Sequence, residues 1–251
     1  MRIFAIANQN CQTMKKHCIR LAIIIIATFG ISSCIVYHPH NAELPLLHKQ
    51  GQMQAEGSLS MSAPLLVSPA INASFAYSPI NKLGTQAAIS ITDFKNLYAQ
   101  GAAGTYFPFG KAVLECYAGY GYGISYFDHR SESQTKKYYI DGHYNLVYGQ
   151  VNFGWAELSD GDFDIGVGLK GGIMSPRWDK ITIDDQGLRS IEETHNDAHF
   201  LLEPQLMLRF GWEQFKFSIN ASYAFLDGWP TDNNYFNYER FSVGLGIHFN
   251  F

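Results

Sequence analysis

The sequence predicts an all-β protein: a closed antiparallel up-and-down transmembrane β-barrel of about ten strands, preceded by an N-terminal lipoprotein signal segment. Three observations predict this fold class. From Gly51 to the end, apolar residues alternate with small or polar ones, which is the period of a strand and not of a helix. Aromatic residues make up 15 % of the chain and charged residues 16 %, with 23 glycines, a composition typical of strands. The later links between these runs alternate between short turns and long polar loops.

The chain begins with a targeting segment. From Met14 it reads as a basic start, an apolar stretch over residues 21–31 and then small residues, which is the pattern of a signal peptide. An apolar stretch this short does not cross a bilayer as a helix, which needs about 20 residues. We therefore expect residues 1–33 to be removed as a signal peptide. Met14 is a more natural start than Met1, because residues 1–13 lack this pattern.

The signal ends at a candidate lipidation site. Residues Ile31-Ser32-Ser33-Cys34 resemble the lipobox of bacterial lipoproteins, where a peptidase cuts before a cysteine whose thiol carries diacylglycerol. Cys34 would be that cysteine; an ordinary secretory signal with an incidental cysteine is the alternative. Residues 34–50 contain two prolines that disfavour helix, and we expect them to form a lipidated N-terminus and periplasmic linker. The other cysteine of the mature chain, Cys116, has no disulfide partner or metal-ligand spacing.

Residues 51–251 form the predicted outer-membrane barrel, and alternation defines its first five strands. Every second residue is apolar and its neighbours are small or polar, as for Phe75 and Tyr77 opposite Asn72 and Ser74. The fourth strand has the weakest pattern, and the fifth carries a glycine stripe over residues 119–123. These strands are expected at residues 52–62, 70–78, 85–92, 97–107 and 112–127.

The second half of the barrel follows the same pattern and ends on a strand whose odd positions are all apolar. Its last residues, Gly246-Ile-His-Phe-Asn-Phe251, resemble the C-terminal signal that the barrel assembly machinery reads in outer-membrane barrels. Gly246, Phe249 and Phe251 are the predicted residues of that signal, and the machinery is an expected partner during biogenesis. The five strands are expected within residues 138–156 and at 163–175, 199–212, 214–226 and 241–251.

Turn lengths predict how the barrel is oriented. Short links occur at residues 78–84, 108–111, 158–162 and 211–214, and long polar links at 128–137, 178–197 and 226–240. Outer-membrane barrels have short periplasmic turns and longer extracellular loops. An even strand number then predicts an outer-membrane protein with both chain ends in the periplasm and the Cys34 lipid in the inner leaflet.

The placement of charge predicts which face meets lipid. The apolar faces carry no Asp, Glu, Lys or Arg in the strand cores, and a cation at the bilayer midplane costs about 2–4 kcal/mol. Aromatic residues are concentrated near both ends of these faces, as expected for interfacial girdles. The opposite faces are predicted to form a closed, non-conducting lumen, because ten strands leave little more room than side chains fill and buried charges need partners. The predicted lumen network is Glu56, Glu115, Asp164, Lys170, Glu203, Arg209, Lys216 and Arg240.

Several stretches carry a family resemblance. The lipobox, LPLLHKQGQMQAEGSLS, FAYSPINKLG, FLLEPQLMLRFGWEQFKF and FSVGLGIHFNF resemble the small, largely uncharacterised outer-membrane β-barrel lipoproteins of Gram-negative bacteria. The resemblance covers most of the mature chain and rests on strand pattern and a few turn residues. It implies a barrel in the outer membrane, in contact with its lipid, and brings no catalytic motif.

Function is predicted from the loops. The favoured hypothesis is a non-enzymatic barrel whose residues 129–143, 177–198 and 227–239 meet an unidentified extracellular partner. The first alternative is an omptin-like outer-membrane hydrolase, in which Asp128-His129 or Asp141 with His143 would activate a water at the rim. The second is a soluble periplasmic ligand-binding barrel. A net charge of −4 predicts no nucleic-acid binding, and no cofactor or metal motif is present.

Overall fold

The structure, a computed structural model, describes residues 35–40, 43–63, 68–93, 95–130, 137–158, 162–183, 187–228 and 237–251. The predicted signal peptide and Cys34 lie outside the described residues. The described residues contain no helix whose length and apolarity would allow it to cross a membrane.

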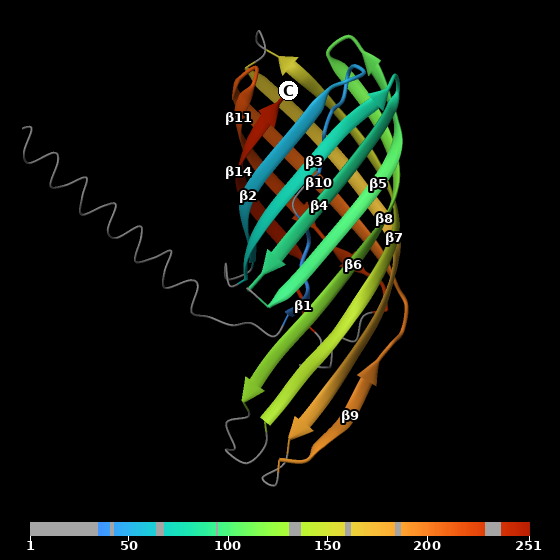
Figure 1. Cartoon of the computed structure of the whole chain (residues 1–251), viewed down its shortest axis with the longest axis vertical. Helices are drawn as coiled ribbons and strands as arrows, with labels where there is room; N and C mark the ends of the chain where they lie inside the picture. Colours follow the sequence, from blue (N-terminus) through green and yellow to red (C-terminus); the bar gives the residue numbers. More distant parts are fainter. Residues whose placement is uncertain are drawn as a thin grey trace, which may run out of the picture.

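In the described residues, ten antiparallel strands close into a barrel, which confirms the predicted closed antiparallel barrel of about ten strands (Figure 1). Each strand pairs with its neighbours in the chain, and pairing of β14 with β2 and of β8 with β10 completes the ring. The weakest predicted strand, at 97–107, is fully formed as β5. The barrel strands are β2 (Met53–Ala63), β3 (Pro69–Ile80), β4 (Leu83–Thr92), β5 (Asn96–Phe109), β6 (Ala112–Arg130), β7 (Lys137–Leu158), β8 (Phe163–Ile183), β10 (His199–Trp212), β11 (Phe215–Tyr223) and β14 (Phe241–Asn250).

Four short strands are attached to this ring. β9 (Arg189–His195) pairs with the end of β8, and β12 (Phe225–Leu226) pairs with the start of β10. β1 (Ile35–Tyr37) and β13 (Asn237–Tyr238) form a separate parallel pair. All four lie at the same end of the barrel.

The two ends of the barrel differ. At the turn end, two-residue links at 81–82, 110–111 and 213–214 join strands, and the C-terminus lies there (Figure 1). At the opposite loop end, β6, β7, β8 and β9 run on well beyond the other strands. The prediction that residues 129–143 and 177–198 are loops is therefore wrong for most of their length. Residues 137–144 pair with residues 176–183, and side-chain burial alternates along this part of β8 as it does in the rest of the wall. We call this part the β6–β9 extension.

The alternation predicted from the sequence sorts residues between the two faces of the wall. Large apolar side chains on the outer face are exposed, among them Leu59, Val147, Leu245 and the predicted girdle residues Trp212 and Phe251. The inner face is buried and carries most of the polar and charged side chains of the wall, together with aromatic and aliphatic ones. Such an inverted arrangement of polarity is what a lipid environment requires of a closed barrel.

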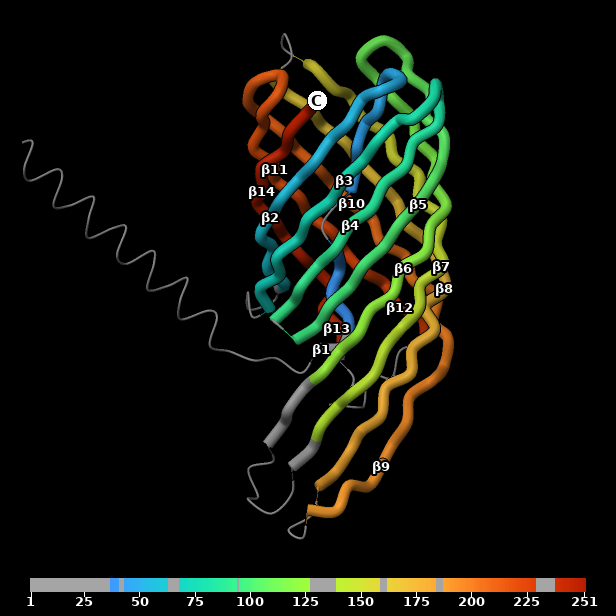
Figure 2. Tube along the Cα trace, in the orientation of Figure 1, coloured from blue at the N-terminus to red at the C-terminus, as the bar shows by residue number. Residues whose placement is uncertain are grey.

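The N-terminal segment runs through the barrel, as the blue stretch between β1 and β2 shows (Figure 2). We call its described residues 37–40 and 43–47 the lumenal segment. All nine are buried, and three are the leucines 44, 46 and 47. The prediction of a linker outside the barrel is wrong for these residues. The same holds for placing both chain ends on one side, since Ile35 pairs at the loop end and Phe251 lies at the turn end. Their apolar content drives them into the barrel, because leucines in a free tether would lie in water.

Candidate functional site

The loop-end half of the lumenal segment is held by aromatic and polar contacts. The Tyr37 hydroxyl donates to Glu203 Oε2 at 2.7 Å, and its ring belongs to the buried cluster that includes Tyr144 and Trp178. The His40 ring stacks on Tyr98 with centroids 3.7 Å apart and planes 4° apart. These residues lie on four strands of the wall, β5, β7, β8 and β10, so the segment is bound on several sides.

The turn-end half is held through its backbone and its leucines. The Leu47 amide donates to Glu115 Oε1 at 2.7 Å, and Gln150 Nε2 donates to the Glu43 carbonyl at 2.8 Å. The three leucine side chains form a second buried cluster with wall residues Tyr106, Val113 and Met207. In this half of the segment, two backbone groups are therefore hydrogen-bonded and the three leucine side chains are packed against the wall.

Glycines of the wall make room for this filling. A Cβ atom at Gly154 would lie 2.9 Å from Leu46 Cδ2, and one at Gly166 would lie 3.1 Å from Leu44 Cδ2. The glycine stripe over residues 119–123 is covered by tyrosine rings; a Cβ at Gly121 would lie 2.2 Å from the Tyr98 hydroxyl. Glycines in the wall therefore lie opposite large side chains inside the lumen. A larger residue at any of these glycine positions would displace the leucine or tyrosine that it faces.

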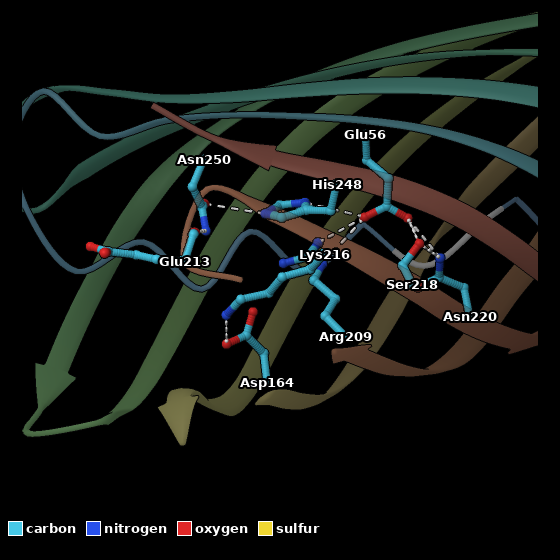
Figure 3. Close-up of polar contacts among 9 residues, drawn as sticks. All are labelled: Glu56, Asp164, Arg209, Glu213, Lys216, Ser218, Asn220, His248 and Asn250. Atoms are coloured by element: carbon cyan, nitrogen blue, oxygen red, sulfur yellow. Dashed lines mark hydrogen bonds and ion pairs between the residues drawn. The ribbon is translucent and has the colours of Figure 1, made fainter. Parts of the chain in front are cut away.

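Glu56 is the centre of the best-connected charge cluster (Figure 3). Arg209 Nη2 lies 3.1 Å from Glu56 Oε2, and the Arg209 Nε–H donates to the same oxygen at 3.3 Å. The other oxygen accepts from Ser218 Oγ at 2.8 Å and from Asn220 Nδ2 at 2.7 Å. His248 Nδ1 is 3.4 Å from Oε2. Both carboxylate oxygens are thus bonded, which a buried charge requires.

Two further ion pairs lie in the lumen. Lys216 Nζ is 2.6 Å from Asp164 Oδ1, close to the first cluster (Figure 3). Lys170 Nζ lies 3.9 Å from Glu203 Oε1 and donates to Gln100 Oε1 at 3.2 Å. Glu203 also receives the bond from Tyr37, so this second group joins the wall to the lumenal segment.

The predicted lumen network differs from the observed one at two residues. Glu115 is buried, but among the described residues its bonds come from the Leu47 amide, Asn152 and Tyr117, and no ion pair is formed. Arg240 is exposed, with its guanidinium 5.8 Å from the Tyr238 ring centroid, so its placement in the lumen is wrong. It precedes β14 at the rim, where alternation no longer fixes the face.

Sequence reasoning missed two members of the lumen. Glu43 was assigned to the linker, yet its carboxylate accepts from Gln100 Nε2 inside the barrel. His248 was available from the alternation of the last strand, since it occupies an inward position between the exposed residues Ile247 and Phe249. The first could be found only by knowing the path of the segment.

The residues of the expected assembly signal lie on the last strand and after it. Phe249 and Phe251 are on the outer face, 40 % and 69 % exposed, with ring centroids 6.4 Å apart. Gly246 is enclosed, since a Cβ there would lie 2.6 Å from Ser218 Oγ. Their arrangement leaves the two aromatic side chains accessible from the outside.

The candidate catalytic residues are not assembled into a site. His143 lies on the outer face of the β6–β9 extension, 5.9 Å from the Tyr122 ring, and Asp141 is exposed on the same face. The side chains of Asp128 and His129 lie outside the described ones. Within the described ranges there is no group of three His, Cys, Asp or Glu residues suited to a metal ion.

Two carboxylates at the loop-end rim have altered acidity. Burial raises the pKa of Asp93, in the turn after β4, to about 6. Burial and the neighbouring Asp93 carboxylate raise the pKa of Glu239. Glu239 also contacts the start of the lumenal segment, because its amide donates to the Tyr37 carbonyl at 2.9 Å.

The spaces left beside the lumenal segment are small. One cavity of about 20 Å³ is lined by Glu43, Glu56 and Arg209, among others, and another of about 20 Å³ lies beside His38 and His40. Each has room for about one water molecule. A larger groove of about 480 Å³ lies at the loop end around Phe200 and Phe225, on the outer face.

No protein-family model matches this chain, and no curated protein matches its sequence. Three solved barrels are similar in structure. The translocator domain of the autotransporter NalP from Neisseria meningitidis is 10 % identical over 81 % of this chain and 90 % of its own, with a TM-score of 0.44. The KdgM porin is 8 % identical over 79 % and 99 %, with a TM-score of 0.40. The N-terminal β-barrel domain of Pseudomonas aeruginosa OprF is 11 % identical over 81 % and 100 %, with a TM-score of 0.37. Likeness at this level says nothing of activity.

Proposed function

We propose that this chain is a non-enzymatic outer-membrane β-barrel lipoprotein whose lumen is closed by its own N-terminal segment. The observation that carries the proposal is the buried lumenal segment inside a barrel with an apolar exterior. A soluble barrel would leave that exterior in water, where contiguous apolar patches of this kind are rare. The turn end faces the periplasm in this proposal, since short turns lie there in outer-membrane barrels.

Anchoring in the membrane has two parts in this proposal. The barrel holds itself in the bilayer through its apolar belt, and an acyl group on Cys34 adds a second anchor. If Cys34 is acylated, the intact mass of the purified protein should equal that of residues 34–251 plus the lipid. A mass that starts elsewhere, or an unmodified Cys34, would remove this part and leave the barrel untouched.

The β6–β9 extension is the proposed surface for an extracellular partner. It projects beyond the rim (Figure 1), and its outer face carries exposed Asp141 and Arg177 and half-buried Asp179, near exposed Leu188 and Ile191. A barrel that needed only to close would have no use for such long hairpins. The mixture of charged and apolar groups fits a protein or glycan surface.

Planar-bilayer recording tests the closed lumen. The purified, refolded protein should give no steady conductance, because ion pairs, leucines and tyrosines fill its interior. Refolded residues 51–251, which lack the lumenal segment, should conduct, provided that the sample still shows heat-modifiable migration of a folded barrel. Porin-like conductance from the full chain would contradict the proposal. A rim hydrolase, the competing hypothesis, predicts hydrolytic activity that is lost when Asp141 is replaced by Asn.

A further inference from the structure

The path of the lumenal segment fixes where the N-terminal side of the barrel lies. Ile35 pairs with Asn237, and Tyr37 pairs with Tyr238, at the loop end. From there to Leu47 the chain runs to the turn end, where the Gly51 amide donates to the Ser78 carbonyl at 2.8 Å. Ten residues in extended form reach about 33–36 Å, enough to cross a hydrocarbon core of about 30 Å. The segment therefore passes the whole depth of the barrel.

A groove opens on the outer face close to that starting point. It has a volume of about 480 Å³ and an apolar floor that includes Phe200, Leu202 and Phe225, with Tyr238 and Arg240 on its border. Phe200 and Phe225 are 49 % and 52 % exposed. Tyr238 lies at once beside this groove and opposite Tyr37 in the β1–β13 pair. The groove thus adjoins the place where the chain enters the lumen.

Strand pairing in the wall also changes at this level, although the Ala224 amide still donates to the Arg240 carbonyl at 2.7 Å. Pairing between β11 and β14 ends at Tyr223 and Phe241, while β12 beyond it pairs with β10. The β1–β13 pair belongs to a separate small sheet. The chain therefore enters the barrel at the loop-end rim, where the pairing of β11 with β14 ends.

We infer that the acyl group on Cys34 lies in the outer leaflet of the membrane, with its hydrocarbon along this groove at the loop end. The inference rests on the proposed function, which takes Cys34 as acylated and the turn end as periplasmic. Cys34 is bonded to Ile35, and consecutive Cα atoms lie about 3.8 Å apart. Aromatic side chains at the floor suit an acyl chain, and the Arg240 guanidinium at the border suits the phosphate level of the leaflet.

An acyl group in the inner leaflet is incompatible with the observed contacts. It would require Ile35 at the turn end, which would withdraw Tyr37 from Glu203 and the His40 ring from Tyr98. Glu203 would then lose a charge-assisted hydrogen bond in a buried site, and such losses are costly. The geometry therefore supports the outer leaflet in place of the inner leaflet that the sequence suggested.

Cysteine pairs in cells test the path, in a Cys116→Ser background. Paired residues of neighbouring strands have Cα atoms about 4.8 Å apart, within the range that a disulfide spans. Ile35→Cys with Asn237→Cys should form an intramolecular disulfide in the outer membrane. Ile35→Cys with Gln50→Cys is the matched control, because Gln50 is exposed at the turn end, and it should remain reduced. The reverse pattern would overturn the inference. Both variants must first show heat-modifiable migration.

Photocrosslinking tests the groove directly. A benzophenone amino acid at Phe225 should give, after illumination and digestion, a peptide joined to the acylated N-terminal peptide. The same group at Phe217 serves as control, since Phe217 is also exposed on the outer face, 43 % against 52 % for Phe225, but does not line the groove. Acylated protein that crosslinks at neither position, or only at Phe217, would overturn the groove assignment.

Two measurements separate this inference from the proposed function. Intact mass reports whether Cys34 is acylated, regardless of the leaflet in which the acyl group lies. A membrane-impermeant maleimide on intact cells should label Asp227→Cys, which is exposed at the loop end, and spare Gln50→Cys. Failure of either measurement contradicts the proposed function. If the protein is acylated and correctly oriented but the variant with Ile35→Cys and Gln50→Cys forms the disulfide, only the inference is contradicted.

Discussion

Glu56 illustrates how single residues set the stability of the lumen. Glu56 is 7 % exposed, and its carboxylate pairs with Arg209. Removing one partner of a buried pair leaves an uncompensated charge and costs about 3–5 kcal/mol, whereas replacing both by apolar groups is often neutral. Glu56→Leu should therefore lower the free energy of unfolding by about 3–5 kcal/mol, and Glu56→Leu with Arg209→Met should regain most of it. Urea unfolding of the refolded barrel measures both; a double variant no more stable than the single one would show that the pair is not coupled.

Asp93 gives a prediction for pH. Burial raises its folded-state pKa to about 6, above the value of about 3.9 in an unfolded chain. The stability that this group contributes is full below pH 3.9 and is lost as the pH rises through about 6. Asp93→Asn, which keeps a side chain tolerant of the φ of 52° at this position, should gain stability relative to the wild type between pH 4 and pH 7. A difference that stays constant over this range would show that Asp93 is not buried in solution.

At the scale of elements, alternation predicted the strands well and their ends poorly. The faces of β6 and β14 follow from side-chain period alone, because a one-residue slip would reverse the whole face. Polar composition does not distinguish a loop from a hairpin that continues into water, so residues 178–183 of β8 were taken for a loop. The lumenal segment has no period at all. Its place depends on long-range contacts such as Leu47 with Glu115, which no local pattern contains.

The β6–β9 extension is expected to be separable from the barrel. Closure depends on residues 163–174 of β8 paired with residues 199–210 of β10, and these lie nearer the turn end than the extension. Deleting residues 181–196 removes β9 and the stack of His195 on Trp178 but none of this pairing. The variant should still migrate as a heat-modifiable barrel on gels. Loss of folding would show instead that the extension helps to close the wall.

The barrel exposes apolar side chains on its outer face and buries polar ones inside. The charged residues of the membrane-spanning strands therefore lie in the lumen. Ten strands leave a space that the side chains alone do not fill, since a further segment of the chain fits within it. The barrel wall and the lumenal segment thus form one structure: glycines on the wall match leucines on the segment, and wall carboxylates bond its tyrosine and its backbone. A wall without the segment would expose paired charges to water, and a segment without the wall has no partner for its leucines.

The apolar exterior makes a prediction that separates a membrane protein from a soluble one. Leu245 is 64 % exposed in the middle of β14, and Leu188, beside β9 and outside the belt, is also 64 % exposed. In a bilayer, Leu245→Lys should cost about 2–4 kcal/mol, because a cation would face lipid near the midplane. Leu188→Lys should change stability by no more than about 0.5 kcal/mol, since its surroundings are aqueous. Urea unfolding in lipid vesicles measures both free energies. If both variants lowered the free energy of unfolding by the same small amount, the belt would face water, and the outer-membrane location would be contradicted.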